Sequence, residues 1–375
     1  MPRGGLTDVP HAPSHPSEPR DSFWPMPRPH PLGLIVNPHS GRDARRLFAR
    51  AGTSTIEDKR SQLTRIVVGA AAAGIEKVVL ARDAFRIASA AVEALALPIE
   101  IELLELPTTG RGIDSEIAAR AMQDRGCAAV VALGGDGTSR AITLAWPEVV
   151  LLPLSTGTNN VFPFDVEATV AGAAAGLVAS GRLALEAAAR RAKIVRVECE
   201  DGRRSLALID AALLVDDHPG SLLQADPEKL AALLLSRAEP ASVGLSPVGG
   251  LLLPCGADDE FGVEVRTHPG PRPEARGKTL RAPLSPGLYH TVGIESVERV
   301  ELGRSVCWTG PGLLAFDGDR EILLAPGESV HLSVVREGPW VIDPVRSLRI
   351  AAEQGLFLDM GPWHDHRSGG GHSCC

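Results

Sequence analysis

The chain has 375 residues and a formal net charge of −8, and only 4% of its residues are aromatic, so its cores must be filled by Ala, Val, Leu and Ile. A chain of this length can hold two domains, because single hydrophobic cores seldom grow beyond about 250–300 residues. The negative charge and the scattered arginines argue against binding to a nucleic-acid backbone, which needs a basic surface.

Residues 1–30 are interrupted throughout by Pro, His, Arg and Ser and contain no apolar signal core. We expect them to form a disordered arm, and we expect residues 359–375 to form a disordered tail. The most apolar helical stretch, residues 168–180, is too short to span a bilayer, which takes roughly 20 residues. The six cysteines show no metal-site spacing, so we predict no metal-binding cysteines and a cytoplasmic location.

Residues 31–165 alternate short apolar runs with helical patterns. The predicted strands are the runs LGLIV, KVVL, IEIELLEL, AAVVAL and VVLLPL. Helical periodicity appears at residues 42–50, 83–96 and 113–124. Continuous apolar strands separated by helices predict a parallel sheet covered on both faces. We therefore expect an α/β domain with a Rossmann-like parallel sheet, followed by a connecting helix within residues 166–190.

Residues 191–342 carry many short β-type segments separated by Gly, Pro and Asp turns, which predict a C-terminal β-sandwich domain. A single helix is predicted within this half, at residues 226–237. A final helix is predicted over residues 343–358, with Asp343 as its N-cap, Pro344 at its first position and Gly355 as its stop. This helix is placed to return to the first domain.

Residues 134–138 read GGDGT, after a predicted strand and before the helical segment SRAITLAW. Ligands bind at the carboxyl ends of parallel strands, where glycines let backbone N–H groups approach phosphate oxygens and a helix start adds its positive dipole end. Asp136 would repel phosphate unless it holds Mg²⁺ or accepts the proton of an attacking hydroxyl. The alternative is a tight turn with an exposed aspartate.

Two other phosphate-binding signatures fail. A dinucleotide fingerprint is excluded because Arg140 stands where its third glycine belongs. A P-loop ending at residues 277–279 is excluded because Arg272 replaces its leading glycine.

Three stretches together resemble the NAD kinase and diacylglycerol kinase superfamily. GGDGT after a strand is the signature of that superfamily, VNPHSG at residues 36–41 resembles the N-P-x-S-G of diacylglycerol kinase domains, and PLSTGTNN at residues 153–160 resembles their P-x-G-T-x-N loop. The wording STGTNNVFP is most similar to the ATP-NAD kinase-like proteins associated with acetoin catabolism. The resemblance covers roughly residues 32–355. It implies a nucleotide-binding α/β domain, a β-sandwich and an active site between them.

By this resemblance, ATP and Mg²⁺ are the expected cofactors, and Asp136 is expected to orient or deprotonate the attacking hydroxyl. The residues implied to hold the ATP phosphates are Gly134, Gly135, Gly137 and Thr138. Those implied to line the nucleotide are Asn37, Thr156, Gly157, Thr158, Asn159 and Asn160. Simpler interpretations stand beside these, since the same residue types form turns and cap local backbone groups.

A second acidic candidate lies in the β-rich half. The stretch from Asp317 to Asp319 resembles an Asp-Gly-Glu stretch with which lipid kinases of this superfamily reach the active site, which makes Asp317 a catalytic candidate. Asp-Gly between two apolar runs is also a strong hairpin signal, and we favour the hairpin as its sole role.

The resemblance implies a kinase that phosphorylates a hydroxyl of NAD, or of another hydroxyl-bearing small molecule, and that forms a homo-oligomer. The chain departs from NAD kinases, whose Asn-Glu pair has its nearest counterpart here in Asn159-Asn160. It departs from lipid kinases in carrying Thr158-Asn159-Asn160 in place of Gly-Asn-Asp. A lipid kinase and a nucleotide-binding regulator without turnover therefore stay open, whereas an oxidoreductase is disfavoured because its glycine fingerprint is absent.

Overall fold

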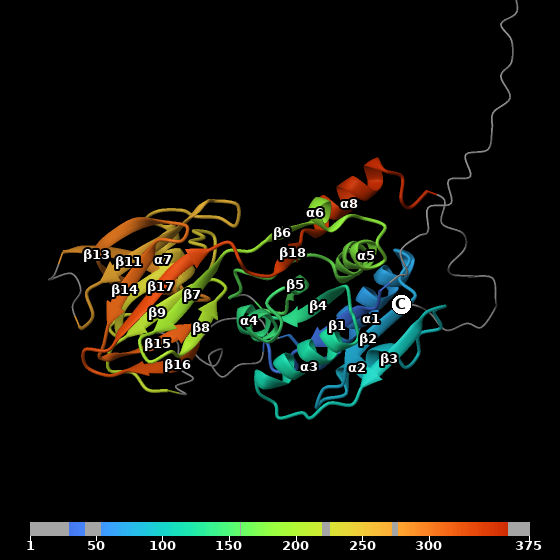
Figure 1. Cartoon of the computed structure of the whole chain (residues 1–375), viewed down its shortest axis with the longest axis horizontal. Coiled ribbons are helices and arrows are strands. Elements are labelled where there is room, and N and C mark those ends of the chain that lie inside the picture. Colours follow the sequence, from blue (N-terminus) through green and yellow to red (C-terminus); the bar gives the residue numbers. More distant parts are fainter. Residues whose placement is uncertain (1–29, 42–53, 158, 220–225, 272–276, 359–375) are drawn as a thin grey trace, which may run out of the picture.

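The computed structural model describes residues 30–41, 54–157, 159–219, 226–271 and 277–358. The expected N-terminal arm up to residue 29, the helix predicted at 42–50, Thr158 and the expected C-terminal tail lie outside these ranges. The described chain forms two domains that lie side by side, one α/β and one rich in β-strands (Figure 1).

Seven strands of the described chain form the first sheet, in the order β3-β2-β1-β4-β5-β18-β6. Strands β1 to β5 and β18 are parallel, and β6 is antiparallel to β18. Their bounds are β1 Leu32–Val36, β2 Lys77–Ala81, β3 Glu100–Leu104, β4 Ala129–Gly134, β5 Val150–Ser155, β6 Ala189–Arg191 and β18 Trp340–Ile342. The parallel sheet is confirmed. It also takes in β18, a segment that the sequence pattern assigns to the β-rich half.

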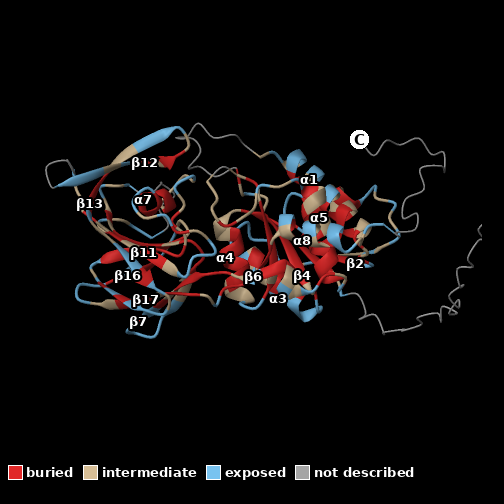
Figure 2. Ribbon diagram, turned by 90° about the horizontal axis from the view of Figure 1, so that it is seen from above, coloured by how far each residue is buried: buried red, intermediate tan, exposed pale blue. Residues whose placement is uncertain are grey.

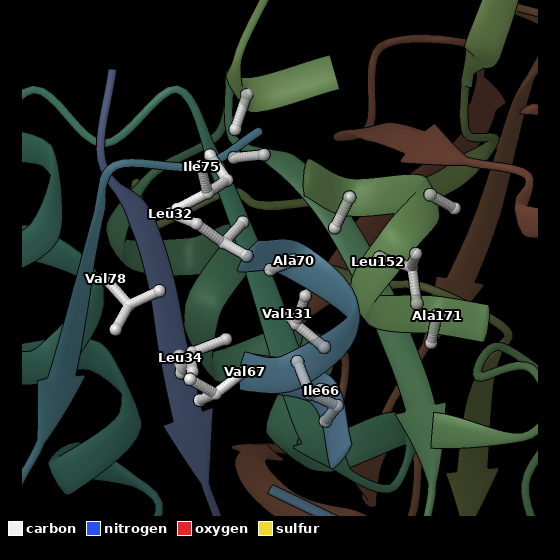
Figure 3. Close-up of a cluster of buried hydrophobic side chains, with 14 of the residues drawn as sticks. Leu32, Leu34, Ile66, Val67, Ala70, Ile75, Val78, Val131, Leu152 and Ala171 are labelled. Atoms are coloured by element: carbon white, nitrogen blue, oxygen red, sulfur yellow. The ribbon is translucent and has the colours of Figure 1, made fainter. Parts of the chain in front are cut away.

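Helices cover both faces of this sheet. The first face carries α1 Ile56–Ala72, α2 Ile87–Val92, α5 Ala168–Ala179 and α8 Pro344–Glu353. The opposite face carries α3 Ile113–Asp124 and α4 Asp136–Ala145, and the short α6 Leu185–Ala188 leads into β6. Figure 3 shows the core beneath α1, where Ile66 and Val67 lie against Leu34 and Val131.

Two features of these helices were missing from the sequence prediction. Helix α1 was not recognised, although Thr55 and Asp58 form a capping box at its start. Helix α5 packs directly on α1, because a Cβ on Gly172 would lie 2.1 Å from the carbonyl oxygen of Ile66, a distance that only glycine permits. The expected connecting helix is therefore part of the first domain, and α8 packs against it with Ala351 buried in the same core.

The second domain is a sandwich of two antiparallel sheets, with the strand orders β12-β13-β11-β10-β9-β15-β16 and β14-β17-β7-β8. The larger sheet contains β9 Asp210–Leu214, β10 Leu230–Leu235, β11 Phe261–Thr267, β12 Lys278–Ser285, β13 Leu288–Glu301, β15 Gly312–Phe316 and β16 Asp319–Leu324. The smaller sheet contains β7 Ile194–Cys199, β8 Arg204–Ala207, β14 Ser305–Thr309 and β17 Ser329–Val335, and α7 spans Ser246–Gly250. Trp308 and Phe316 are buried between the sheets.

The helix predicted at residues 226–237 is wrong, because this segment forms strand β10. Ala232 and Leu234 face the core between the two sheets, whereas Leu233 and Leu235 face the core on the other side of the larger sheet. Burial on both faces removes the alternation by which a strand is recognised. The remaining run of Ala and Leu has the composition of a helix, and the tertiary environment overrides that propensity.

The chain crosses between the domains at Ala192 and again near Pro339, within the described residues. These crossings are joined, since the Ala192 N–H donates to the Pro339 carbonyl oxygen at 2.9 Å. Phe162 of the first domain shares a buried cluster with Leu208 and Val335 of the second. Figure 2 shows buried residues in the interiors of both domains, whereas β12 and β13 are exposed over much of their length. No helix in the described ranges is long and apolar enough to cross a membrane.

Candidate functional site

The strand order creates a crevice between β1 and β4. These strands are neighbours in the sheet, yet the chain after β1 leads to α1 on one face and the chain after β4 leads to α4 on the other. The carboxyl ends of such a pair form the usual ligand site of open α/β sheets. The Nδ2 atom of Asn37, after β1, donates to Oγ1 of Thr138 in α4 at 2.8 Å. Two of the predicted loops therefore meet at this crevice.

The loop after β1 is held in a fixed conformation. Oδ1 of Asn37 accepts hydrogen bonds from the N–H groups of His39 at 2.9 Å and Ser40 at 3.2 Å. Asn37 is thus a turn former, as the simpler interpretation expected, and it also joins this loop to Thr138. The turn is thus observed, and the place of Asn37 beside a nucleotide stays a prediction.

A buried lysine that sequence reasoning missed supports the same loop. Lys59 in α1 is fully buried, and its Nζ donates to the carbonyl oxygens of Asn37 at 2.9 Å, Pro38 at 2.8 Å and Ser40 at 2.5 Å. The Oγ of Ser40 lies 2.7 Å from Oγ1 of Thr156 in the loop after β5. The three predicted loops therefore form one connected group. The capping box before α1 could have located the helix, but no local signal indicates where the Lys59 amine points.

The glycines of GGDGT let α4 begin close to its neighbours. Helix α4 starts at Asp136, three positions earlier than the predicted helical segment, with Gly135 as its N-cap. Gly135 has no side chain with which to accept from the first-turn N–H groups, so these groups are available to an anion. A Cβ on Gly135 would lie 2.7 Å from Oδ1 of Asn160, whereas a Cβ on Gly137 would meet nothing closer than Oδ2 of Asp319 at 3.5 Å.

Gly134 is restricted in the same way, since a Cβ there would lie 2.5 Å from the side chain of Thr138. Its carbonyl oxygen accepts the N–H of Thr156 at 3.3 Å, which draws the loop after β5 against GGDGT. Gly134 therefore leaves space for the Thr138 side chain at the crevice. Thr138 in turn joins α4 to the loop after β1.

The loop after β5 folds on itself. Oγ of Ser155 donates to the carbonyl oxygen of Gly157 at 2.8 Å and accepts from Nδ2 of Asn160 at 2.8 Å. Asn160 is therefore a local cap, whereas Asn159 lines the cleft between the domains. Thr158, the remaining predicted residue of this loop, lies outside the described residues.

Asp136 is not the exposed turn residue of the simpler interpretation. It is half-buried, and its Oδ1 accepts the backbone N–H groups of Val161 at 3.1 Å and Phe162 at 2.9 Å. Loss of water around the carboxylate, with Asp317 nearby, raises the pKa of Asp136 to about 7, although the two amides favour the charged form. A carboxyl with this pKa can change protonation state near neutral pH, as a general base must.

Asp317 forms the predicted turn and also lies at the cleft. Asp317 and Gly318 have φ angles of 48° and 90° and form the two-residue turn between β15 and β16, so the predicted hairpin is confirmed. The Asp317 carboxylate also lines the cleft and accepts the N–H groups of Leu208 at 2.7 Å, Ile209 at 2.8 Å and Asp210 at 3.1 Å. Burial raises its pKa, against the effect of Arg140 and these amides. The hairpin is therefore not its sole role.

Asp210, at the start of β9, is a cleft residue that sequence reasoning missed. Its Oδ1 is buried and has no hydrogen-bond partner among the described residues. Burial, and then the charges of Asp317 and Asp136, raise its pKa well above the usual value. A single acid inside the apolar run LALIDAALLV is the signal that could have identified it, because an aspartate is rarely buried without a specific role.

The cleft itself lies between the domains. The first domain contributes Asp136, Asn159 and Val161, and the second contributes Asp210, Asp317 and an apolar wall that includes Leu214, Leu245 and Leu284. A second hollow, at the carboxyl ends of β1 to β3, is lined by residues that include Asn37, His39, Asp83 and Asp114. The described residues contain no group of His, Cys, Asp and Glu side chains arranged to hold a metal ion by themselves.

An ion pair between the buried Arg140 and the partly exposed Glu321 holds α4 against the second domain. Arg140 is 3% exposed, and its guanidinium forms two hydrogen bonds with the Glu321 carboxylate, at 2.5 and 2.8 Å. It also donates to the Leu206 carbonyl oxygen at 2.6 Å and to the Ser205 hydroxyl at 2.8 Å. Arg140 therefore has a structural role at the position where a dinucleotide fingerprint would have glycine.

Arg237 supports the Asp136 region from the second domain. Its guanidinium lies 5.0 Å from the centroid of the Phe162 ring, and Nη1 donates to the Val161 carbonyl oxygen at 3.5 Å. Both contacts fall on the loop whose N–H groups bind Asp136. The second domain therefore helps to position the first domain's candidate base.

Residues 193–337 match the family model of the acetoin catabolism protein X C-terminal domain. Acetoin catabolism protein X from Cupriavidus necator is 34% identical over 342 residues, which cover 88% of this chain and 94% of that protein. Among solved structures, yeast NADH kinase complexed with NADH is 11% identical with a TM-score of 0.50, covering 91% of this chain and 92% of that one. A putative diacylglycerol kinase from Bacillus anthracis str. Sterne is 13% identical with a TM-score of 0.40, covering 84% and 98%.

The yeast structure agrees with the α/β and β-sandwich organisation described above, and at its low identity it shows the fold alone. The relationship to the Cupriavidus protein extends over nearly the whole of both chains. The chain therefore belongs to the acetoin catabolism protein X family, which is built here on an NAD kinase-like fold.

Proposed function

We propose that this protein is an ATP-dependent kinase that transfers a phosphoryl group to a hydroxyl, with NAD as the leading acceptor. The observation that carries the proposal is the placement of Asp136. It stands at the glycine-capped start of α4 and also borders the cleft between the domains. One residue thus adjoins both the place suited to phosphates and the place open to an acceptor.

The crevice between β1 and β4 would bind ATP. The first-turn N–H groups of α4 suit phosphate oxygens, and the glycine at position 137 leaves space for a close approach. The hollow at the ends of β1 to β3, which Asn37 and His39 help to line, would receive the nucleoside.

Mg²⁺ fits this site in the way it usually fits kinases, since it needs one or two carboxylates together with the phosphates of the nucleotide. Asp319, whose carboxylate lies beside Gly137, would hold it, and Asp136 would then act as the base. When bound, Mg²⁺ would offset the negative charge of the phosphates. The lack of a protein-only metal cluster in the described chain is compatible with this arrangement.

The acceptor hydroxyl would enter the cleft beside Asp136, which takes its proton as the hydroxyl attacks. With a pKa raised to about 7, a substantial fraction of Asp136 is deprotonated near neutral pH and can act as this base. A reducing cytoplasm and a homo-oligomer complete the proposal. The four described cysteines are unpaired, which accords with that compartment.

A lipid kinase is the second candidate, because the cleft wall formed by Leu214, Leu245 and Leu284 would accept an apolar acceptor. A nucleotide-binding regulator without turnover is the third. It would use the crevice between β1 and β4 without the chemistry of Asp136.

The test is the purified full chain with ATP and Mg²⁺ against NAD, NADH and short-chain diacylglycerol, scored for ADP and for phosphorylated product. We expect ADP and a phosphorylated pyridine nucleotide in equal amounts. Phosphorylated lipid instead would select the second candidate. ATP binding in calorimetry without ADP release for any acceptor would select the regulator and reject the kinase.

A further inference from the structure

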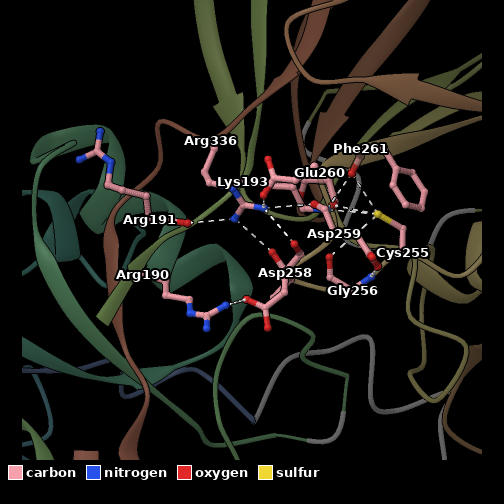
Figure 4. A network of polar contacts seen from close by, with 12 residues as sticks. Arg190, Arg191, Lys193, Cys255, Gly256, Asp258, Asp259, Glu260, Phe261 and Arg336 are labelled. Atoms are coloured by element: carbon pink, nitrogen blue, oxygen red, sulfur yellow. Dashed lines mark hydrogen bonds and ion pairs between the residues drawn. The ribbon is translucent and has the colours of Figure 1, made fainter. Parts of the chain in front are cut away.

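Lys193 and Cys255 form a buried amine–thiol pair beside the crossing between the domains (Figure 4). Each residue is 1% exposed. Nζ of Lys193 lies 3.1 Å from Sγ of Cys255, and it donates to the carbonyl oxygen of Phe261 at 2.7 Å. Neither residue lines the cleft or the crevice, so the proposed kinase reaction does not use them.

Backbone pairing fixes both members of the pair. Lys193 directly follows Ala192, whose N–H and carbonyl groups bond to Pro339 and Gly338 in the returning crossing at 2.9 and 3.0 Å. Cys255 exchanges two backbone hydrogen bonds with Ala238, at 2.8 and 2.9 Å. The short distance between amine and thiol is therefore set by two anchored segments.

Arg336 holds the loop after Cys255 against the same crossing. Its Nη1 donates to the carbonyl oxygens of Arg191 and Ala257, each at 3.2 Å, and its Nη2 donates to the Glu260 carboxylate at 2.7 Å. Figure 4 shows these contacts surrounding the lysine and the cysteine. The two reactive groups are therefore confined together.

The chemical environment allows the amine to act on the thiol. Lys193 forms no ion pair with a carboxylate in the described part of the chain, in contrast to Lys77 and Lys229. Burial lowers the pKa of Lys193, with Cys255 opposing, and burial raises the pKa of Cys255. Burial therefore favours the neutral amine, which is the form that peroxide can oxidise, and the hydrogen bond that Nζ donates to Sγ stabilises the thiolate, the nucleophilic form of the cysteine.

We propose that peroxide joins Lys193 and Cys255 covalently through a single oxygen atom, giving an Nζ–O–Sγ bridge. The Cys255 thiolate attacks a first hydrogen peroxide, breaking its O–O bond and giving sulfenic acid and water. A second hydrogen peroxide oxidises the amine to a hydroxylamine, again releasing water. The hydroxylamine oxygen then attacks the sulfenic sulfur, an O–S bond forms, and the sulfenic oxygen leaves as water.

This reaction balances with two molecules of peroxide consumed and three molecules of water released. The sulfur and the nitrogen are each oxidised, and peroxide oxygen is reduced. Cys255 is fully buried, so its oxidation is slower than that of Cys307, the exposed cysteine of the described chain. The product fastens the crossing at Lys193 to the loop at Cys255.

The experiment treats the purified full chain with hydrogen peroxide over time, followed by proteolysis and mass spectrometry. We expect one linked pair of peptides, containing Lys193 and Cys255, heavier than the two together by one oxygen less two hydrogens. Addition of dithiothreitol before proteolysis should separate them. Oxidation of Cys307 in the same sample provides the internal measure of peroxide exposure.

Three variants test the assignment. The linked pair should fall to background in Cys255→Ser and in Lys193→Met, and it should persist in Cys307→Ser, the matched control. The wild-type reduction step keeps the proposal testable if either buried variant fails to fold. The proposal is overturned if Cys255 stays unmodified at the end of a peroxide exposure many times longer than the one that fully oxidises Cys307. It is also overturned if Cys255 is oxidised to the sulfinic acid while Lys193 stays free.

Discussion

The two sides of the candidate site are built differently. On the first domain's side, Asn37, Thr138 and Thr156 belong to loops that bond directly to one another, so the crevice between β1 and β4 is already formed. On the second domain's side, Asp317 is saturated by three backbone N–H groups, whereas the neighbouring Asp210 has a buried oxygen without a partner in the described chain.

This contrast suits a site in which each domain binds a different ligand. A fixed set of loops suits a ligand that is the same in every turnover, as a nucleotide donor would be. An unsatisfied polar atom in a cleft suits a group supplied by the acceptor, because leaving it buried and unpaired is unfavourable. The first domain would thus determine the donor, and the second domain the acceptor.

The largest effect is expected at Asp136, which lies where the first domain borders the cleft. In Asp136→Asn the remaining oxygen can still accept from Val161 and Phe162, but the group can no longer take a proton. We expect turnover to fall by about 10²–10⁴-fold, the usual contribution of general-base catalysis. The wild-type rate should rise with pH up to about 7, the pKa of Asp136, and the residual rate of the variant should lack this rise.

Coupled measurement of ADP release at several pH values tests this expectation, with ATP affinity measured separately by calorimetry. We expect that affinity to survive, since a negative charge near the phosphates is removed. Wild-type turnover in the variant would remove Asp136 from the chemistry and make Asp317 the next candidate.

Next in size is the ion pair that joins the two sides. Arg140→Met leaves the Glu321 carboxylate, the Ser205 hydroxyl and the Leu206 carbonyl without the guanidinium. We expect the free energy of unfolding to fall by about 1–3 kcal/mol, because these acceptors lose their donor while the 36% exposed Glu321 carboxylate regains part of its hydration. Urea denaturation measures it. The matched control is Arg65→Met, whose ion pair with Glu167 is 46% exposed on each side and should contribute less than about 1 kcal/mol.

Equal losses in Arg140→Met and Arg65→Met would show that the bridge between the domains is no stronger than an exposed ion pair. The contrast between the two sides of the cleft would then not depend on a rigid connection between them.

A third test addresses the fixed loops of the first domain. A methyl group in Gly135→Ala would press on Oδ1 of Asn160, which lies 2.7 Å from the position of the new Cβ. The Asn160 side chain would have to turn away and give up its hydrogen bond to Ser155, which is worth about 0.5–1.5 kcal/mol, so nucleotide affinity should fall by at most about tenfold. Gly112→Ala is the control, because a Cβ there meets nothing within 4 Å. Calorimetric ATP affinities that match between the two variants would place the nucleotide elsewhere.

A fourth test addresses the second domain's side alone. Asp210→Asn should raise the KM for the acceptor by about tenfold, since the amide cannot reproduce the hydrogen bond that the carboxyl group would make with the acceptor. ATP affinity should stay unchanged if the donor belongs to the first domain. Asp124→Asn, an exposed change at the end of α3, is the control. A change in ATP affinity without a change in the acceptor KM would reverse the proposed division.

The last test concerns the pH dependence of stability. The folded chain keeps the Asp136 proton up to about pH 7, whereas the unfolded chain releases it near the usual 3.8. The folded state therefore binds more protons in this window, and raising the pH favours unfolding. Urea titrations at about pH 5 and about pH 8 should show wild type losing more stability than Asp136→Asn. An equal loss in both would contradict the raised pKa.

The sequence by itself determined the parallel sheet, the sandwich and the positions of the three loops that follow β1, β4 and β5. These depend on local signals: apolar runs interrupted by helical patterns, and glycines that follow a strand. GGDGT could be assigned to a strand end because CAAVVAL precedes it directly, and the hairpin at Asp317 could be read from an Asp-Gly pair between apolar runs.

Only the tertiary structure decided which strands are neighbours and which side chains converge. Strand β10 resembled a helix because burial on both of its faces erased the alternation that marks a strand. Lys59, Asp210 and Arg140 acquire their roles from groups far away in the chain, which no local pattern encodes. The pKa of Asp136 likewise depends on the charge of Asp317, 181 positions later in the chain. It also depends on the loss of water around its carboxylate, which the local sequence does not determine. Desolvation and charge proximity arise only when the two domains pack together.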